Sequence, residues 1–181
     1  MMGSLVSGIK SFFTFGSVRG MQYSFKEVEM ADPNRDIYIQ SARAFVIMFD
    51  VTNNTSTRLI WSNLMAIQRL KNTHCGNIPI VIIGNKCDKK KRELEIGVGD
   101  AIAYGHWCSY FEVSTKRADQ VYAAVYYVLS RVAGEGDVSI AVMGRGGVGK
   151  TSFIKAITGE NYAIRRITPA TREYVTGFVL P

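Results

Sequence analysis

The stretch VSIAVMGRGGVGKTSFIKAI, residues 138–157, determines how the rest of the chain is read. An apolar run over 138–143 is followed by glycines and then by a segment with helical periodicity. Residues 144–151 match the pattern G-x-x-x-x-G-K-[ST] at every required position, and this pattern between a strand and a helix is typical of a phosphate-binding loop. In domains that use such a loop it normally lies near the N-terminus. Here it lies in the last quarter of a chain of 181 residues.

The residue types in this loop suit nucleotide phosphates. Its glycines let backbone N–H groups converge on the α and β phosphates, and Lys150 can reach the β and γ oxygens as a point charge. The Thr151 hydroxyl can bind a magnesium ion. A glycine-rich turn with a purely structural role is the alternative, but the Gly-Lys-Thr ending has no packing rationale. We assign to nucleotide binding Arg145, Gly146, Gly147, Val148, Gly149, Lys150, Thr151 and Ser152.

Short apolar runs and helical patterns alternate along the chain. Four runs are apolar at most positions: 44–49, 78–83, 110–113 and 138–143. Such runs are typical of parallel strands covered on both faces, and helically spaced apolar residues follow the first and the third. The alternation predicts an α/β domain with a doubly wound, mostly parallel sheet of six strands. The segments 21–30 and 172–181 are its less hydrophobic strands, nearer an edge.

Polar residues after two of these runs indicate which base is bound. Asn85, Lys86 and Asp88 come directly after the run at 78–83 and are assigned to the base. The two oxygens of an aspartate match the N1–H and the exocyclic amine of guanine, whereas adenine offers no matching pair of donors. Three more polar residues follow the run at 110–113: Ser114, Thr115 and Lys116. The backbone N–H groups of the last two can bond the base oxygen, so guanine is the expected base.

Composition limits the partners. The formal net charge is +7 and 47% of the residues are hydrophobic, so we expect one domain with a sizeable core and an attraction to acidic partners such as a nucleotide. Cys75, Cys87 and Cys108 lack the spacing of a zinc site, so no zinc is expected. No apolar run approaches the roughly 20 residues that cross a bilayer. We expect a cytoplasmic protein without an evident membrane anchor. The basic stretch 86–93 has no interleaved aromatics, which argues against nucleic acid.

Three motifs together resemble those of the Ras-like small GTPases. GRGGVGKT at 144–151, GNKCD at 84–88 and VSTK at 113–116 are similar to that family's phosphate-loop, guanine-specificity and final base-contact motifs. YIQSARAFVIMFDVTNNTS at 38–56 is similar to its central strand-and-turn segment. The resemblance covers about residues 21–180. It implies GTP and GDP as ligands, Mg²⁺ as cofactor, and protein regulators or effectors as partners of a monomer.

The order of these motifs is inverted relative to that family, in which the phosphate loop comes first. The sequence therefore resembles a circular permutation of a Ras-like domain. A linker at about 134–137 would join the family's last helix, here about 117–133, to its first strand, and the new ends would fall in a hairpin whose C-terminal strand is the one antiparallel edge strand. We expect one permuted GTPase domain over 21–181 after an extension at 1–20. The permuted ribosome-assembly GTPases fit poorly, because both of their switches follow the phosphate loop.

The first of the two segments that sense the γ-phosphate in the family is expected after the phosphate-loop helix. Tyr162 lies where the family carries an aromatic residue that packs on guanine. Thr168 or Thr171 offers the hydroxyl that senses magnesium. The spacing from Thr151 favours Thr168.

The second of these segments departs further from the family's pattern. VEMADPNRDIY at 28–38 contains neither the usual glycine nor the usual glutamine. Glu29 or Asp32 must then supply the carboxylate of this switch. Pro33 lies where the glutamine would lie, and it has neither a backbone N–H nor a polar side chain.

These observations favour a magnesium-dependent GTPase with a slow intrinsic rate. Its expected catalytic residues are Lys150, Thr168 and Asp32, and its expected metal ligands are Thr151 and Thr168. The alternative is a guanine-nucleotide-gated interaction module with little or no hydrolysis. RNA binding through the basic surface is a third possibility, and it predicts salt-dependent affinity that is independent of nucleotide.

Overall fold

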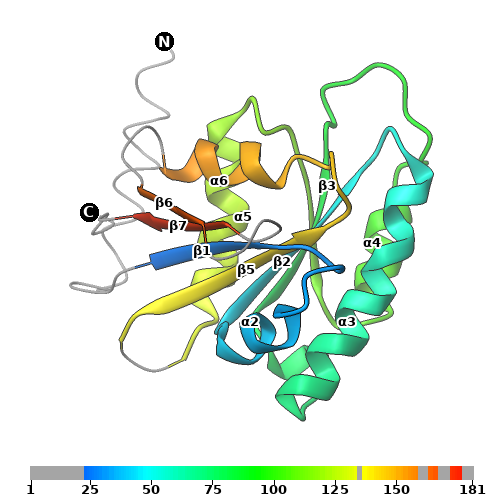
Figure 1. Cartoon of the computed structure of the whole chain (residues 1–181). Coiled ribbons are helices and arrows are strands. Elements are labelled where there is room, and N and C mark those ends of the chain that lie inside the picture. Colours follow the sequence, from blue (N-terminus) through cyan, green and yellow to red (C-terminus); the bar gives the residue numbers. More distant parts are fainter. Residues whose placement is uncertain (1–22, 134–135, 159–162, 167–171, 177–181) are drawn as a thin grey trace.

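The computed structural model describes residues 23–133, 136–158, 163–166 and 172–176, and strands and helices alternate along most of this length (Figure 1). The strands are β1 (Tyr23–Val28), β2 (Ala44–Asp50), β3 (Ile80–Asn85), β4 (Ser109–Val113), β5 (Val138–Gly144), β6 (Ala163–Arg166) and β7 (Arg172–Thr176). The helices are α2 (Arg35–Ser41), α3 (Arg58–Lys71), α4 (Val98–Tyr104), α5 (Ala118–Ser130) and α6 (Lys150–Thr158), with 3₁₀ turns η2 (Asn54–Thr57) and η3 (Cys75–Asn77). The extension expected at 1–20 and the domain ends expected at 21 and 181 lie outside the described residues.

The described strands form one sheet in the order β4-β3-β2-β5-β1-β7-β6. Its first five strands pair in parallel, whereas β7 is antiparallel to β1 and β6 is antiparallel to β7. The strand before the phosphate loop, β5, therefore lies between β1 and β2 in the middle of the sheet (Figure 1). This order confirms the doubly wound, mostly parallel α/β fold and the antiparallel pairing of the C-terminal strand with β1.

One prediction about the sheet is wrong. The sequence predicts six strands with the C-terminal strand at the edge, whereas the described residues form seven strands and β6 lies outside β7. Strand β6 has only four residues, AIRR, and two of them are arginines. A segment so short and so polar gives no apolar run from which a strand could be predicted.

Helices cover both faces of the sheet and make two hydrophobic cores. All seven residues of β2 are buried, and the six apolar ones, 44–49, alternate between the two cores. Phe45 and Ile47 pack with residues of α2, α3 and α4, whereas Val46 and Met48 pack with residues of α5 and α6. A strand that is buried on both faces must be apolar throughout, which explains why this run does not alternate in sequence.

The carboxyl ends of the parallel strands place the candidate site. Strand β5 ends at Gly144, β3 at Asn85 and β4 at Val113. In a doubly wound sheet, the loops that leave this edge lie side by side and are the usual place for a ligand. The phosphate loop and the two guanine segments therefore meet here, although they are far apart in sequence.

The junction between α5 and β5 is tied to the sheet by Arg43, which precedes β2. Its Nη1 donates to the carbonyl oxygens of Gly136 and Asp137, each at 3.2 Å, and its Nη2 donates to that of Ala133. Residues 134–135 of the expected linker lie outside the described part of the chain. Among the helices that the structure describes, none combines the length and apolar character needed to cross a membrane.

Candidate nucleotide-binding site

The phosphate loop connects β5 to α6, as the sequence predicts. Gly147 and Gly149 have φ angles of +81° and +102°, a region that favours glycine. A Cβ atom on Gly149 would also lie 2.3 Å from Nδ2 of Asn85. The turn of the backbone therefore favours glycine at both positions, and the close approach of the guanine segment is a second reason for glycine at 149.

Lys150 is almost completely buried at the start of α6. Its Nζ donates to the carbonyl oxygens of Gly144 at 3.1 Å and Arg145 at 3.3 Å, within the loop itself. It also lies 3.8 Å from Oε1 of Glu27 and 3.7 Å from Oε1 of Glu29, both near the end of β1. The ammonium is thus held at the phosphate loop by backbone oxygens and faces two carboxylates.

Thr151 contacts a carboxylate that the sequence analysis did not select. Its hydroxyl lies 2.9 Å from Oε2 and 3.1 Å from Oε1 of Glu27. The sequence favoured Glu29 or Asp32 as the carboxylate of this switch and did not consider Glu27. Glu27 lies within β1, in register with Val142 of the neighbouring β5, and this pairing brings it beside the loop that follows β5.

Asp32 lies in the turn before α2. It is 4% exposed, and its Oδ1 accepts a hydrogen bond from the backbone N–H of Asn34 at 2.7 Å. The backbone N–H groups of Asp32 and Arg35 bond the carbonyl oxygens of Glu29 and Asp32, respectively. These bonds fix the turn that carries Pro33. The catalytic role expected of Asp32 stays a prediction.

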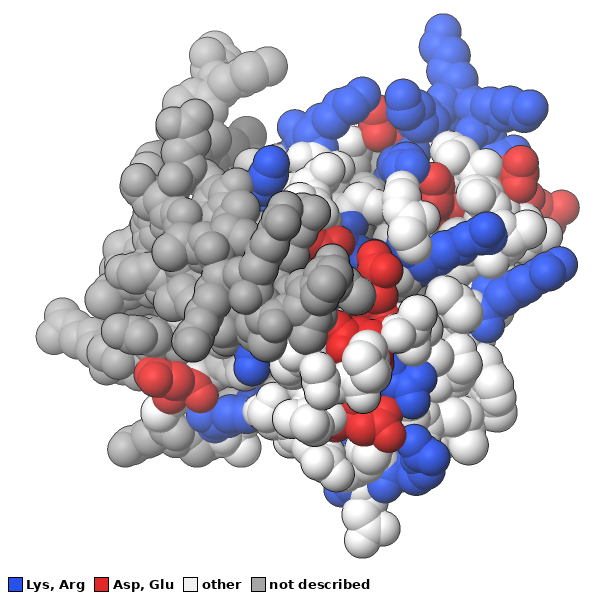
Figure 2. Space-filling model, in the orientation of Figure 1, with Lys and Arg blue, Asp and Glu red and all other residues white. Residues whose placement is uncertain are grey.

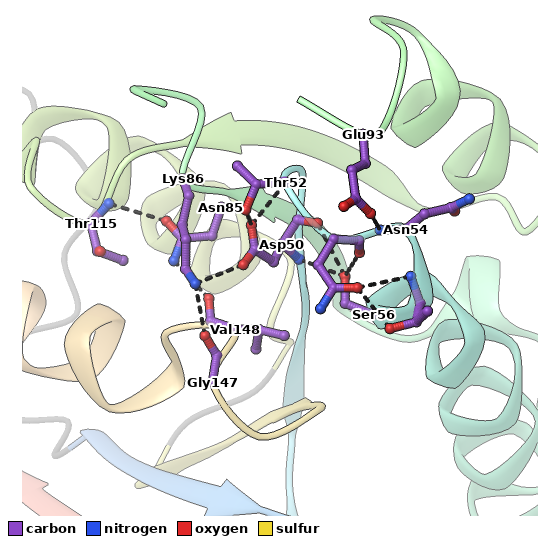
Figure 3. Close-up of polar contacts among 12 residues, drawn as sticks. Asp50, Thr52, Asn54, Ser56, Asn85, Lys86, Glu93, Thr115, Gly147 and Val148 are labelled. Carbon is purple, nitrogen blue, oxygen red and sulfur yellow. Dashed lines mark hydrogen bonds and ion pairs between the residues drawn. The ribbon is translucent and has the colours of Figure 1, made fainter. Parts of the chain in front are cut away.

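The guanine segment after β3 is bonded directly to the phosphate loop (Figure 3). Nδ2 of Asn85 donates to the carbonyl oxygen of Val148 at 2.8 Å, and its Oδ1 accepts from the backbone N–H of Thr115 at 3.2 Å. Nζ of Lys86 donates to the carbonyl oxygen of Gly147 at 2.9 Å. Asn85 and Lys86, which the sequence analysis assigns to the base, therefore join the three loops of the site in this structure.

Asp50, the last residue of β2, is a site residue that the sequence analysis missed. It is 7% exposed, and its Oδ2 lies 2.6 Å from Nζ of Lys86. Its Oδ1 accepts hydrogen bonds from the backbone N–H and the hydroxyl of Thr52. Burial raises the pKa of Asp50, but these bonds outweigh burial and lower it overall. A single acidic residue closing a fully apolar strand was the available signal.

The expected base-selecting aspartate is held by the segment after β4. Oδ1 of Asp88 accepts from the hydroxyl of Ser114 at 2.9 Å, and its Oδ2 lies 2.8 Å from Nζ of Lys116. The hydrogen bond from Lys116, followed by that from Ser114, holds the pKa of Asp88 below its usual value. The backbone N–H of Lys116 bonds Oγ of Ser114 at 3.3 Å. The structure thus brings together the two guanine segments.

The remaining predicted residues divide into those that the structure describes and those that it does not. Arg145 is exposed, and its guanidinium donates to the hydroxyl of Thr55 in η2. Ser152 is exposed in the first turn of α6. Tyr162 and Thr168 lie outside the described residues.

The oxygen donors near Lys150 suit a magnesium ion that also binds phosphate. Mg²⁺ prefers oxygen ligands and usually takes few of them from the protein. Thr151 and Glu27 supply a hydroxyl and a carboxylate beside the phosphate loop. Among the described residues, no group of three or more His, Cys, Asp or Glu side chains could hold a metal by itself. These residues therefore fit a magnesium ion bound together with a nucleotide.

Comparison with known proteins finds one family model and several proteins whose names contain Ras. The family model described as Ras family matches residues 29–134. A protein named "Circularly permutated Ras protein 1" from Dictyostelium discoideum is 28% identical over 66% of this chain and 14% of its own length. "Ras-like protein rasB" from the same organism is 30% identical over 54% of this chain and 49% of its own length. "GTP-binding protein Di-Ras1" from Homo sapiens is 31% identical over 43% of this chain and 39% of its own length.

These matches agree with the order of elements in the sheet. The chain spans less than half the length of each of these relatives. The family match covers more than half of this chain and ends before β5 and the phosphate loop. Strand β5, which follows the matched segment and leads into the phosphate loop, nevertheless lies in the middle of the same sheet. The chain therefore belongs to the Ras family, with its segments in circularly permuted order.

Proposed function

We propose that this chain binds GTP and GDP together with Mg²⁺ and hydrolyses GTP slowly, as a Ras-like switch with protein regulators or effectors as partners. One observation carries the proposal: the phosphate loop and both guanine segments form a single hydrogen-bonded network. Asn85 bonds the carbonyl oxygen of Val148 and the N–H of Thr115, so it links all three. A network of this kind fixes the distance between the phosphates and the base.

The choice of guanine rests on Asp88. Ser114 and Lys116 hold its carboxylate and keep it ionised, and two carboxylate oxygens can pair with the two donors on the edge of guanine. To bind the base in this way, the carboxylate must give up or share these contacts. Adenine would offer one donor where two are needed, so it would leave a charged oxygen without a partner.

The chain's own groups account for phosphate and cation binding. The N-terminus of α6 would attract an anion, because its first backbone N–H groups lack partners within the helix, and Lys150 adds a positive charge there. Thr151 would hold the magnesium ion, with Thr168 as the second hydroxyl that the resemblance implies. When bound, the ion would neutralise charge on the β and γ phosphates.

Slow hydrolysis is proposed because the second switch lacks a side chain that could orient water. Pro33 replaces the glutamine, and the turn around it is fixed by the hydrogen bond from Asn34 to Asp32. Phosphoryl transfer depends on positioning and on charge stabilisation, so losing the water-orienting group lowers the rate. The same feature favours the second candidate function, a guanine-nucleotide-gated interaction module that hardly turns over.

RNA binding has weaker support. On the face shown in Figure 2, acidic side chains gather near the middle and basic ones lie mostly toward the edges. The described residues on this face therefore do not form a continuous basic surface. Continuous basic tracks are what nucleic-acid backbones require.

Single-turnover hydrolysis of GTP by the chain, loaded with GTP and Mg²⁺ and without any partner, tests the proposal. Ras itself hydrolyses GTP at a rate on the order of 10⁻⁴ per second, and we expect a rate at or below this value. The Pro33→Gln variant should hydrolyse GTP no faster than the wild type. Its new side chain would extend from a backbone in the wrong position, and a misplacement of about 1 Å lowers the rate roughly a hundredfold. Turnover of about one per second or faster would show that another residue positions the water. A chain that cannot be loaded with GTP would refute both candidate functions.

A further inference from the structure

Two of the three cysteines meet at the amino ends of the parallel strands, the edge of the sheet opposite the candidate nucleotide site. Cys75 begins η3, shortly before β3, and Cys108 directly precedes β4, which pairs with β3. Cys75 is buried in the core that α3 and α4 cover, and half-buried Cys108 packs against the same core. The thiol of Cys108 donates a hydrogen bond to the sulfur of Cys75. We call these two residues the cysteine pair.

Contacts from several elements fix the two turns that carry the cysteine pair. A Cβ atom on Gly76 would lie 3.3 Å from Cβ of Trp107, so the two turns touch. The carbonyl oxygen of Gly76 accepts a hydrogen bond from Arg131 of the turn after α5 at 3.1 Å. The backbone N–H of Cys108 donates to the carbonyl oxygen of Ala103 at 3.0 Å. Trp107 is held at a φ of +57°, which is uncommon for a bulky residue. The two sulfurs are therefore brought together by the fold.

The hydrogen bond between the two thiols makes them chemically unequal. It lowers the pKa of Cys75, although burial acts in the opposite direction, and together with burial it raises the pKa of Cys108. The pair thus contains one sulfur that is stabilised as a thiolate and one that is more exposed. Oxidants react with thiolates rather than with thiols. The third cysteine, Cys87, differs in that burial, followed by the charges of Glu112 and Asp88, raises its pKa.

We propose that the cysteine pair is an oxidation site, at which a peroxide converts Cys75 and Cys108 into a disulfide that joins η3 to the start of β4. With hydrogen peroxide, a thiolate of the pair attacks one oxygen. The O–O bond breaks, an S–O bond forms and hydroxide leaves, so the sulfur is oxidised to a sulfenic acid and the peroxide is reduced. The second thiol then attacks this sulfur. The S–S bond forms, the S–O bond breaks, and the hydroxyl leaves as water with the proton of the second thiol.

The disulfide would close a loop that contains β3, the first guanine segment and α4. A cross-link of this kind removes conformations from the unfolded chain, so oxidation should stabilise the fold. Because β3 and β4 lead to Asn85 and Ser114, the bond would also join the two strands that carry the guanine segments. The inference concerns the thiols alone and does not depend on nucleotide binding.

The experiment treats the dilute, full chain with hydrogen peroxide, alkylates the remaining thiols and digests the product with trypsin without reduction. Trypsin cleaves after lysine and arginine, so each cysteine lies on its own peptide, at 72–86, 87–89 and 93–116. Mass spectrometry then identifies the peptides that are joined. Cys75→Ala and Cys108→Ser each remove one member of the pair. Cys87→Ser is the matched control, because it removes the third thiol and leaves the pair. Circular dichroism verifies that each variant is folded.

We expect the wild type and Cys87→Ser to give a joined peptide of 72–86 and 93–116, lighter by two hydrogens than the sum of its parts. Cys75→Ala and Cys108→Ser should give no joined peptide, and their remaining thiol should stop at a sulfenic acid that dimedone captures. The oxidised wild type should unfold at a urea concentration about 1 M or more above that of the reduced chain. Dithiothreitol should reverse the shift.

Several outcomes would overturn the inference. A bond from the peptide 87–89, or one between two copies of the chain, would show that the pair is not the site. Three free thiols after a treatment that fully oxidises glutathione would show that the pair does not react. An unchanged urea midpoint in the cross-linked chain would contradict the stabilising role. Should Cys75→Ala fail to fold, Cys108→Ser still decides, since a loss of two thiols in that variant would contradict the pairing.

Discussion

Lys86 shows how single side chains hold the candidate site together. Its ammonium lies 2.6 Å from Oδ2 of Asp50 and donates to the carbonyl oxygen of Gly147 at 2.9 Å (Figure 3). Its backbone φ of +68° is uncommon for a lysine, and that strain must be offset by the contacts that the side chain makes. At the scale of the residue, Lys86 therefore links the end of β2 to the phosphate loop, through an ion pair with Asp50 and a hydrogen bond to Gly147.

Replacing Asp50 by asparagine should reveal this ion pair in the stability of the chain. Loss of the charge on Asp50 is costly because Asp50 is only 7% exposed, but the cost is limited because the side chain of Lys86 is about a third exposed. We therefore expect the free energy of unfolding to fall by about 1–2 kcal/mol. Bonds from Lys86 and Thr52 lower the pKa of Asp50 despite burial. A lowered pKa means that the carboxylate stabilises the fold above its unfolded value of about 3.9, and that this contribution is lost as pH falls through the folded value.

Urea unfolding followed by circular dichroism, at neutral and at acidic pH, measures both effects. The difference between wild type and Asp50→Asn should be present at neutral pH and shrink in acid. Glu95→Gln should show no such difference, since Glu95 is exposed. An Asp50→Asn chain with wild-type stability at neutral pH would show that the pair is incidental.

Replacing Asp88 by asparagine should change which base is bound. An amide cannot accept from both guanine donors, but it can donate to the additional ring carbonyl of xanthine. We expect Asp88→Asn to lose GTP affinity by at least about tenfold and to gain affinity for xanthosine triphosphate, because the hydrogen bonds concerned involve a charged acceptor. Competition against a fluorescent guanine nucleotide measures both. An unchanged preference for guanine would contradict the assignment of Asp88.

At the scale of the element, the turn between β5 and α6 is determined by its glycines. Gly149 has a φ of +102°, and a Cβ there would lie 2.3 Å from Nδ2 of Asn85. Gly146 lies in the same loop, but its Cβ would meet nothing within 4 Å. The loop therefore contains both a glycine that the structure requires and a glycine that it does not.

The Gly149→Ala variant should be destabilised by about 2 kcal/mol or more, from backbone strain and from the clash with Asn85. The Gly146→Ala variant should change the free energy of unfolding by less than about 0.5 kcal/mol. Urea unfolding of the nucleotide-free chain measures both. Equal effects of the two substitutions would mean that the loop adapts to a side chain at Gly149, against the geometry described here.

How far the elements can be predicted from sequence depends on their burial. Strands β2 and β3 are buried throughout and β5 is buried at every residue but Ser139, so their apolar runs reveal them. Strand β6 is short and rich in arginine, and it is defined by its pairing with β7, which no local pattern shows. Glu27 was missed for a similar reason, since its position beside Thr151 follows from the register of β1 with β5. Local motifs identify the loop, and long-range pairing determines which carboxylate reaches it.

At the scale of the whole molecule, permutation changes the order of the chain but keeps the sheet. Strand β5 comes fifth in sequence and lies fourth in the sheet, between β2 and β1. Arg43 precedes β2 and donates hydrogen bonds to Ala133 and Gly136, on both sides of the junction before β5. These bonds tie the junction to the sheet beside β2. The motifs therefore assemble one site although their order in the chain is inverted.

Competition between nucleotides for the whole chain tests the central claim most directly, namely that the permuted chain assembles a guanine-specific site. A fluorescent GDP analogue is bound in Mg²⁺ and displaced by unlabelled GDP or by ADP. Because a site built to bond the donors of one base leaves a charged group unpaired with the other, GDP should displace the analogue at a concentration at least about a hundredfold lower than ADP. Equal displacement by ADP, or no binding of the analogue at all, would contradict the account.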